Sequence, residues 1–208
     1  MPTGLLIALE GIDGSGTTTQ GAHLCETLRS RGLSVHLTAE PSTGPIGQVI
    51  RRVLHGELAM TSRVLAMLFA ADRIDHLERE INPQLERGAV IVSDRYLLSS
   101  LAYQSLDNPL DWVADLNKLA RRADLNLLLR VSSETAARRR AQRGGPEERF
   151  DALATQRRVA AAYDRVFTLT DVGPCAVLDG KQDMASVEAT ILVQVDALIA
   201  RKARGAAT

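Results

Sequence analysis

Short apolar runs alternate along the chain with longer segments in which apolar residues recur every three or four positions. The apolar runs lie at 5–9, 33–37, 89–92, 125–131 and 176–178. Runs of this length are typical of strands buried on both faces of a parallel sheet. Segments with helical spacing lie near 17–31, 46–54, 61–77, 110–122, 133–143, 150–168 and 184–199. This alternation predicts one α/β domain over 1–208, with helices on both faces of a five-stranded parallel sheet.

Composition and charge narrow the class of partner. The 208 residues include 25 Lys and Arg against 25 Asp and Glu, so the net charge is zero. A protein that binds nucleic acid through bulk charge needs a surplus of cations, and no apolar run approaches the roughly 18 residues that a membrane span requires. The two cysteines and four histidines show no metal-ligand spacing. We expect no nucleic acid and no membrane among the partners, and a cytoplasmic location.

A glycine-rich turn between the first predicted strand and the first predicted helix carries the clearest motif. Residues 11–18 read GIDGSGTT, against the phosphate-loop pattern G-x-x-x-x-G-K-[ST]. Backbone N–H groups in such a turn and the N-terminus of the next helix form an anion site suited to the phosphates of ATP. The alternative is a glycine-rich turn without a ligand. The residues expected to bind ATP here are Gly11, Ile12, Asp13, Gly14, Ser15, Gly16, Thr17, Thr18 and Thr19.

The motif departs from the pattern at one position. Thr18 lies where a hydroxyl would hold Mg²⁺, but Thr17 occupies the place of the lysine. Losing the lysine removes a cation from the β- and γ-phosphates, where charge accumulates in the transition state of phosphoryl transfer. Either another cation compensates, or the protein binds nucleotide and turns it over slowly.

A second polar group follows the third predicted strand. Asp94 and Arg95 stand at the carboxyl end of that strand, where ligands bind in open α/β sheets. The Asp94 carboxylate is suited to ordering Mg²⁺ or its water. The Arg95 guanidinium is suited to holding a phosphate through two hydrogen bonds. The alternative for this pair is a salt bridge on the surface.

Four segments together resemble thymidylate kinases, the P-loop enzymes that phosphorylate dTMP with ATP. The segments are 10–20, 68–73 (LFAADR), 94–104 (DRYLLSSLAYQ) and 148–151 (ERFD), and their order and spacing span nearly the whole chain. The resemblance implies a three-layer P-loop kinase fold with a small arginine-rich lid at about 138–150. It also implies transfer of a phosphoryl group from ATP to dTMP, giving dTDP and ADP, with Mg²⁺ as cofactor. A homodimer formed through the helices within 46–77 is a further implication.

The resemblance assigns a role in base and sugar recognition to five residues. Phe69 would stack on the thymine ring, and Arg73 would donate to a thymine carbonyl. Ser100 and Gln104 would contact the edge of the base, and Tyr103 would crowd the 2′ position of the sugar and favour deoxyribose. Each alternative is less specific: a lone Phe on a helix most often packs in the core, and a lone Arg is most often a solvated charge.

It assigns a second set of roles around the phosphates. Arg95 and Arg51 would hold the phosphate of the substrate. Asp13 would lie near the 3′-OH, the phosphate and the metal, so that Thr18, Asp13 and Asp94 form the expected metal site. The adenine pocket of ATP would form at Gly180 and Lys181.

The lid region is rich in cations. Residues 138–158 contain seven arginines and three acidic residues. We expect lid arginines to replace part of the missing lysine charge, with Arg143 and Arg149 as the first candidates and Arg139 as the next. The alternative is a solvated basic helix. The complete catalytic set expected from the sequence is Asp13, Asp94, Arg95, Arg139, Arg143 and Arg149.

Two departures from the family pattern leave the acceptor open. Residues 38–44 read TAEPSTG, where many bacterial members have an arginine and paired glycines, and Arg130 stands where members often have an aspartate. One alternative is therefore a kinase for another pyrimidine deoxynucleoside monophosphate, such as dUMP or dCMP. The alternative outside the active enzymes is a catalytically weakened homologue that binds nucleotide.

Overall fold

The fold is built on one sheet of five parallel strands. The computed structural model describes residues 4–144, 149–169 and 172–205. The sheet order is β2-β3-β1-β4-β5, and each adjacent pair is parallel. The strands are β1 (Leu5–Glu10), β2 (Val35–Ala39), β3 (Val90–Asp94), β4 (Leu125–Arg130) and β5 (Cys175–Asp179). This arrangement confirms the predicted α/β fold with a five-stranded parallel sheet.

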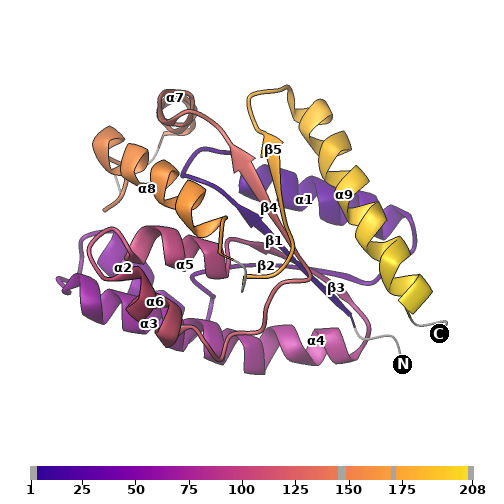
Figure 1. Cartoon of the computed structure of the whole chain (residues 1–208), viewed down its shortest axis with the longest axis horizontal. Helices are drawn as coiled ribbons and strands as arrows, with labels where there is room; N and C mark the ends of the chain where they lie inside the picture. The colour runs from indigo at the N-terminus through magenta and orange to yellow at the C-terminus, as the bar shows by residue number, and fades with distance from the viewer. Residues whose placement is uncertain (1–3, 145–148, 170–171, 206–208) are drawn as a thin grey trace.

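Helices cover both faces of the sheet (Figure 1). Apolar side chains of α1 and α9 pack on one face, and those of α4, α5 and α8 pack on the other. The helical elements are α1 (Thr17–Ser30), α2 (Pro45–Leu54), α3 (Ser62–His76), the π-helical turn η1 (Leu77–Ile81), α4 (Asn82–Glu86), α5 (Leu97–Gln104), α6 (Leu110–Leu116), α7 (Ser133–Arg143), α8 (Leu153–Val166) and α9 (Met184–Gly205). Among these described helices, none is long and apolar enough to cross a membrane.

Some element boundaries differ from the prediction for physical reasons. α6 ends near Asn117, well before the predicted end at 122, because the buried side chain of Asn117 donates to Val113 O at 2.9 Å and accepts from Arg73. Pro83 lies in the first turn of α4, which follows η1 directly, at a position that tolerates a proline.

The lid is described only in part. α7 runs from Ser133 to Arg143, and Ser132 caps its N-terminus, with Oγ accepting from Thr135 N at 3.2 Å. Residues 145–148 of the predicted lid, including Glu148 of the fourth matched segment, lie outside the described residues. The phosphate loop and Asp94 meet at the carboxyl edge of the sheet, because β1 and β3 are neighbours with Leu9 opposite Asp94.

Candidate active site

The phosphate loop has the backbone that its glycines permit. Gly14 and Gly16 have φ values of 89° and 101°, in the left-handed region that favours glycine. A Cβ at Gly14 would lie 2.5 Å from Ala136 O of α7, so the loop and the lid helix approach closely. Gly16 begins α1 without a side-chain cap, which leaves the first N–H groups of the helix for an anion.

Oxygen ligands suited to Mg²⁺ stand beside the loop. Thr18 Oγ1 donates to Asp94 Oδ2, and Asp94 Oδ1 is buried without a hydrogen-bond partner among the described residues. Within the same part of the chain, no three His, Cys, Asp or Glu side chains cluster as a complete metal site. Because Mg²⁺ is commonly held by one or two carboxylates together with substrate phosphates and water, this donor set fits the ion.

Arg95 and Asp13 form a partly buried ion pair between the loop and the end of β3. Arg95 has a φ of 68°, which is uncommon outside glycine and often found at functional sites. Its Nη2 donates to Asp13 Oδ1 at 2.6 Å, and its Nη1 donates to Gly11 O at 2.7 Å. Burial alone would raise the pKa of Asp13, but Arg95 and hydrogen bonds from Tyr103 and Gln156 hold it below its ordinary value.

Glu10 lies behind this pair at the end of β1. One carboxylate oxygen accepts from Tyr96 N at 3.1 Å, and the other accepts from Ser99 and Tyr163. Burial raises the pKa of Glu10 to about 7, although the hydrogen bond from Ser99 and the charge of Arg95 oppose the rise. Ser99 and Tyr163 also contact Arg95, so Glu10 helps to position the Arg95 guanidinium through these two side chains.

A first pocket gathers the residues predicted to recognise base and sugar. It opens between α3, α5 and the segment after β2. Of the predicted residues it contains Asp13, Phe69, Arg73, Arg95, Ser100, Tyr103 and Gln104. Arg51 is not among the described lining residues, because its guanidinium donates to the backbone oxygens of Pro41 and Ser42 instead.

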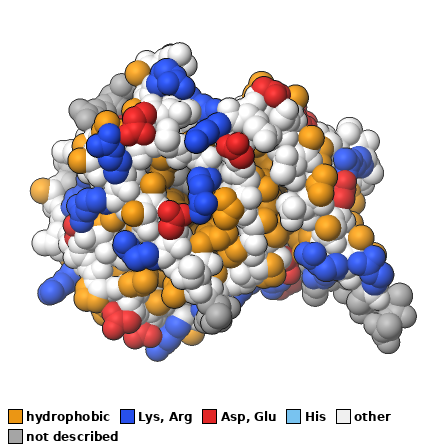
Figure 2. Space-filling view, turned by 45° about the horizontal axis from the view of Figure 1, so that its top comes forward, with side chains coloured by type: hydrophobic (Ala, Val, Ile, Leu, Met, Phe, Trp, Pro, Cys, Tyr) orange, Lys and Arg blue, Asp and Glu red, His pale blue; other side chains and the backbone are white. Residues whose placement is uncertain are grey.

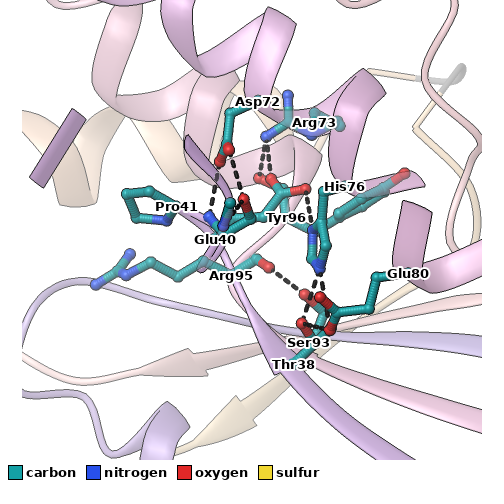
Figure 3. A network of polar contacts seen from close by, with 12 residues as sticks. Thr38, Glu40, Pro41, Asp72, Arg73, His76, Glu80, Ser93, Arg95 and Tyr96 are labelled. Carbon is teal, nitrogen blue, oxygen red and sulfur yellow. Dashed lines mark hydrogen bonds and ion pairs between the residues drawn. The ribbon is translucent and has the colours of Figure 1, made fainter. Parts of the chain in front are cut away.

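Arg73 is the most heavily bonded residue of this pocket. Its exposed fraction is 1%, and its Nη2 contacts Glu40 Oε2 at 2.6 Å, Ser100 Oγ at 2.9 Å and Tyr96 O at 3.1 Å. Its Nη1 donates to Asn117, while Nε is buried without a partner among the described residues. Figure 3 shows Arg73 and Glu40 meeting beside Tyr96. The guanidinium is thus fixed, and its Nε–H is left without an acceptor among the described residues.

A second pocket is formed by the phosphate loop and α7. Four guanidinium groups line it, those of Arg95, Arg139, Arg140 and Arg143, together with Asp13, Gly14, Gly16, Thr17, Thr18 and Thr19. Figure 2 shows Lys and Arg side chains gathered around the hollowed face, with acidic side chains between them. This charge is suited to polyphosphate.

Two of these arginines connect α7 to the loop. Arg139 donates to Ser15 O at 3.2 Å and to Gly180 O at 2.9 Å. Arg140 donates to Asp13 O, and its Nη2 donates to Asp151 O at 2.9 Å. These hydrogen bonds hold both guanidinium groups beside the phosphate loop.

Arg149 and Lys181 lie elsewhere. Arg149 donates to Met60 O at 3.2 Å, on the side of the first pocket, and it is not among the described residues that line the second. Lys181 lines a separate hollow with Ile12 and Tyr163. Gly180 lines a further hollow beside the start of α1, together with Ser15 and Arg139.

Several residues of the two pockets have no role in the sequence-based prediction. Arg140 and Glu40 are the most consequential, and Phe150 also belongs to this group. Gln156 lines neither pocket, but it donates to Asp13 Oδ2 at 3.0 Å and had no predicted role either. A signal existed for Arg140, because residues three apart on a helix share a face and Arg143 was a candidate. Phe150, whose ring meets that of Tyr103 edge-on with centroids 5.3 Å apart, lies in the matched segment 148–151, but the resemblance assigned it no role.

Comparisons with known proteins agree with this geometry. A family model described as thymidylate kinase matches residues 9–191. A probable thymidylate kinase of Thermococcus kodakarensis is 36% identical over 207 residues, which are 94% of this chain and 98% of that protein. A thymidylate kinase of Ruegeria pomeroyi is 38% identical over 202 residues, or 91% and 93% of the two chains. A probable thymidylate kinase of Pyrococcus abyssi is 42% identical over 166 residues, or 77% and 81%. The chain belongs to the thymidylate kinase family.

Proposed function

We propose that the protein transfers the γ-phosphoryl group of ATP to the phosphate of dTMP, giving dTDP and ADP. One observation carries this proposal: Asp13 and Arg95 line both pockets. A base held in the first pocket and a polyphosphate held in the second would bring their phosphates together at these two residues. Phosphoryl transfer depends chiefly on such positioning and on neutralising charge, so no protein nucleophile is needed.

The first pocket suits a thymine nucleotide. Phe69 offers an aromatic face for the base, and the unused Nε–H of Arg73 suits a carbonyl oxygen. Ser100 and Gln104 supply further polar groups at the base edge, and Gln104 Oε1 is buried without a partner among the described residues. We assign Tyr103 to the sugar, since its hydroxyl donates to Asp13 at 3.0 Å between the base pocket and the phosphate loop.

At the junction, Arg95 holds the phosphate of dTMP. Asp13 keeps the guanidinium in place before substrate binds, and the phosphate takes over part of that pairing. Mg²⁺, held by Thr18 and Asp94 with Asp13 nearby, supplies charge neutralisation at the ATP phosphates when bound.

Lid arginines supply the charge that Thr17 lacks. Arg140 and Arg143 face the phosphate loop, and Arg139 lies between that loop and Gly180, where we place the adenine side of ATP. A contact between Arg149 and a phosphate stays a prediction. The place of Lys181 in the adenine pocket also stays a prediction.

ADP release from ATP and Mg²⁺ tests the proposed function. The reactions contain dTMP, dUMP, dCMP or no acceptor, with the same ATP concentration throughout. We expect the highest kcat/KM with dTMP and the lowest with dCMP, because its amino group donates where Arg73 also donates. Nucleotide binding without acceptor-dependent ADP release would instead favour a nucleotide-binding homologue, the second candidate that Thr17 supports.

We also propose a homodimer and a cytoplasmic location. Val64 and Met67 are three apart on α3 and are 43% and 50% exposed, so they form an apolar strip on a helix within 46–77. Light scattering should give twice the chain mass of 22.5 kDa, and Met67→Asp should lower it. A mass of one chain at all protein concentrations would contradict the dimer.

Cell fractionation tests the cytoplasmic location, and recovery of the protein in the cytoplasmic fraction is the expected result.

A further inference from the structure

We propose that His76 is a positioning residue for base recognition: through Glu40 it fixes the guanidinium of Arg73. The inference rests on the proposed function, because that function assigns Arg73 to the thymine base. His76 lies at the end of α3, one turn beyond Arg73, and does not line the base pocket itself. Its effect on the substrate therefore passes through Glu40.

The three side chains form a continuous buried chain of charge. Glu40 Oε2 accepts from Arg73 Nη2 at 2.6 Å, and Glu40 Oε1 faces His76 Nδ1 at 3.4 Å. The side chains of Arg73, Glu40 and His76 are 1%, 3% and 1% exposed. In Figure 3 the carboxylate of Glu40 lies between the guanidinium and the imidazole, with one oxygen turned to each. A buried carboxylate held from both sides has little freedom to rotate.

The hydrogen-bond partners of His76 require protons on both ring nitrogens. Thr38 Oγ1 donates its single hydrogen to Glu80 Oε1 at 2.6 Å, so it accepts from His76 Nε2 at 2.7 Å. Glu40, ionised beside Arg73, only accepts, so His76 Nδ1 must carry the hydrogen that faces it. The ring is therefore an imidazolium in this arrangement, and Glu40 bridges two cations.

The charges around His76 favour that form. Facing it are Glu40 from the segment after β2, Glu80 from η1, and Asp72 and Arg73 from α3. His36 of β2 reaches Glu80 from the far side, at 2.8 Å. Burial alone would lower the pKa of His76, but the hydrogen bond and charge of Glu40, with the charges of Glu80 and Asp72, raise it above its ordinary value.

Loss of the His76 proton would disturb Arg73. A neutral ring has one nitrogen that only accepts, and that nitrogen would face either the acceptor oxygen of Glu40 or the Thr38 oxygen whose hydrogen is already used. Glu40 would lose its second anchor, and the guanidinium would be less well oriented toward the base. The phosphate loop lies outside this network. Base affinity should therefore fall at high pH while turnover at saturating dTMP changes little.

Two variants test the inference. His76→Gln removes the imidazolium, and His36→Gln is the matched control because His36 contacts the same Glu80 but not Glu40. Binding of dTMP and of ATP is measured by calorimetry, and turnover by ADP release, from about pH 6 to about pH 9. We expect His76→Gln to raise the dTMP Kd and KM by about tenfold or more, the effect of one poorly oriented charge-assisted hydrogen bond. The Kd for ATP should not change, and His36→Gln should match the wild type.

The wild-type pH profile adds a test that needs no variant. Its Kd for dTMP should rise above the pKa of His76, and ¹⁵N shifts of the ring should show both nitrogens protonated at neutral pH. A His76→Gln protein with wild-type affinity and pH profile would overturn the inference and leave the proposed function standing. So would a neutral ring in the wild type. A wild-type protein that binds dTMP without turnover would overturn the kinase function but still allow the affinity test, whereas one that does not bind dTMP would overturn both.

Discussion

Replacing Arg140 by methionine takes one guanidinium out of the pocket that it shares with three other arginines. Methionine keeps the helical tendency and the unbranched apolar stem, so the change is chiefly one of charge and hydrogen bonding. Arg140 spans the wall of the pocket, donating to Asp13 O on the phosphate loop and to Asp151 O at 2.9 Å beyond the lid helix. Its charge is therefore held beside the loop whose lysine is replaced by Thr17.

The expected loss follows from the charge. At about 5 Å from a phosphate oxygen, a unit charge contributes about 3 kcal/mol at an effective dielectric constant near 20. That figure agrees with the roughly 10²-fold to 10³-fold loss of kcat that follows removal of one preorganised donor. We expect kcat to fall by about 10² in Arg140→Met, with a smaller change in the KM for dTMP, because Arg140 does not line the base pocket.

The decisive assay combines this variant with Thr17→Lys. If Arg140 replaces the missing lysine, restoring the lysine should recover more activity in Arg140→Met than it adds to the wild type, where four arginines already neutralise the phosphates. Steady-state ADP release from the four proteins of this cycle measures the coupling. Arg138→Met is the matched control, because Arg138 neighbours the site on α7 but is exposed and absent from the described lining of the pocket.

Thermal unfolding separates charge from structure. Arg140→Met also loses contacts with Asp13 and Asp151, so its melting temperature should fall somewhat, and Thr17→Lys should not restore it. Equal effects of Thr17→Lys in both backgrounds would refute the reasoning. Arg140 would then act by tying the lid helix to the loop, and the lysine charge would have no substitute there.

Three further predictions concern other parts of the site. Burial raises the pKa of Glu10 from 4.5 to about 7, so between these pH values the folded state keeps a proton that the unfolded chain releases. The free energy of unfolding should therefore fall by about 3 kcal/mol as the pH rises from 4.5 to about 7. Denaturant titrations over this pH range should show that Glu10→Gln lacks this dependence of stability on pH. Thr18→Ala should lower kcat and raise the Mg²⁺ concentration needed for half-maximal rate. Because Thr18 is exposed and loses only its hydrogen bond to Asp94, the melting temperature should fall only slightly. An unchanged Mg²⁺ titration would contradict the metal assignment. Phe69→Ala should raise the KM for dTMP about tenfold through lost stacking, measured by steady-state kinetics. An unchanged KM for dTMP would contradict the stacking assignment.

The fold was largely predictable because buried parallel strands carry a continuous apolar signal. β1, β3 and β4 are covered on both faces, so their sequences are apolar throughout almost all their length. α5 was the element that no pattern indicated as a helix. All eight of its residues are buried, including Ser99, Ser100 and Gln104, so the alternation of apolar and polar faces that marks a surface helix is absent.

The site was predictable where topology alone decides proximity. Asp94 had to lie near the phosphate loop, because β3 and β1 end at the same edge of the sheet. Topology does not determine how α7 is rotated about its own axis, so the sequence could not predict which of its arginines face the loop. The rotation is set by packing of Ala136 against Gly14, and this contact turns Arg139 and Arg140 toward the loop. Arg149 lies in a turn whose position depends on a backbone contact with Leu54, and sequence spacing carries no trace of that contact.

A neutral chain can nevertheless build a strongly cationic site, because the charges are sorted in space. Four arginines and one aspartate line the second pocket, so its local charge is positive although the net charge of the whole chain is zero. Asp13 stays ionised at neutral pH, since its pKa is held below the ordinary value, and it occupies Arg95 in the absence of substrate. In the proposed function, the phosphate of the substrate would therefore meet a guanidinium that is already oriented, and it would compete with one carboxylate rather than with bulk water. Three of the four arginines lie on α7 and Arg95 directly follows β3, so in the proposed function the absence of a lysine at Thr17 removes one contributor from a distributed set.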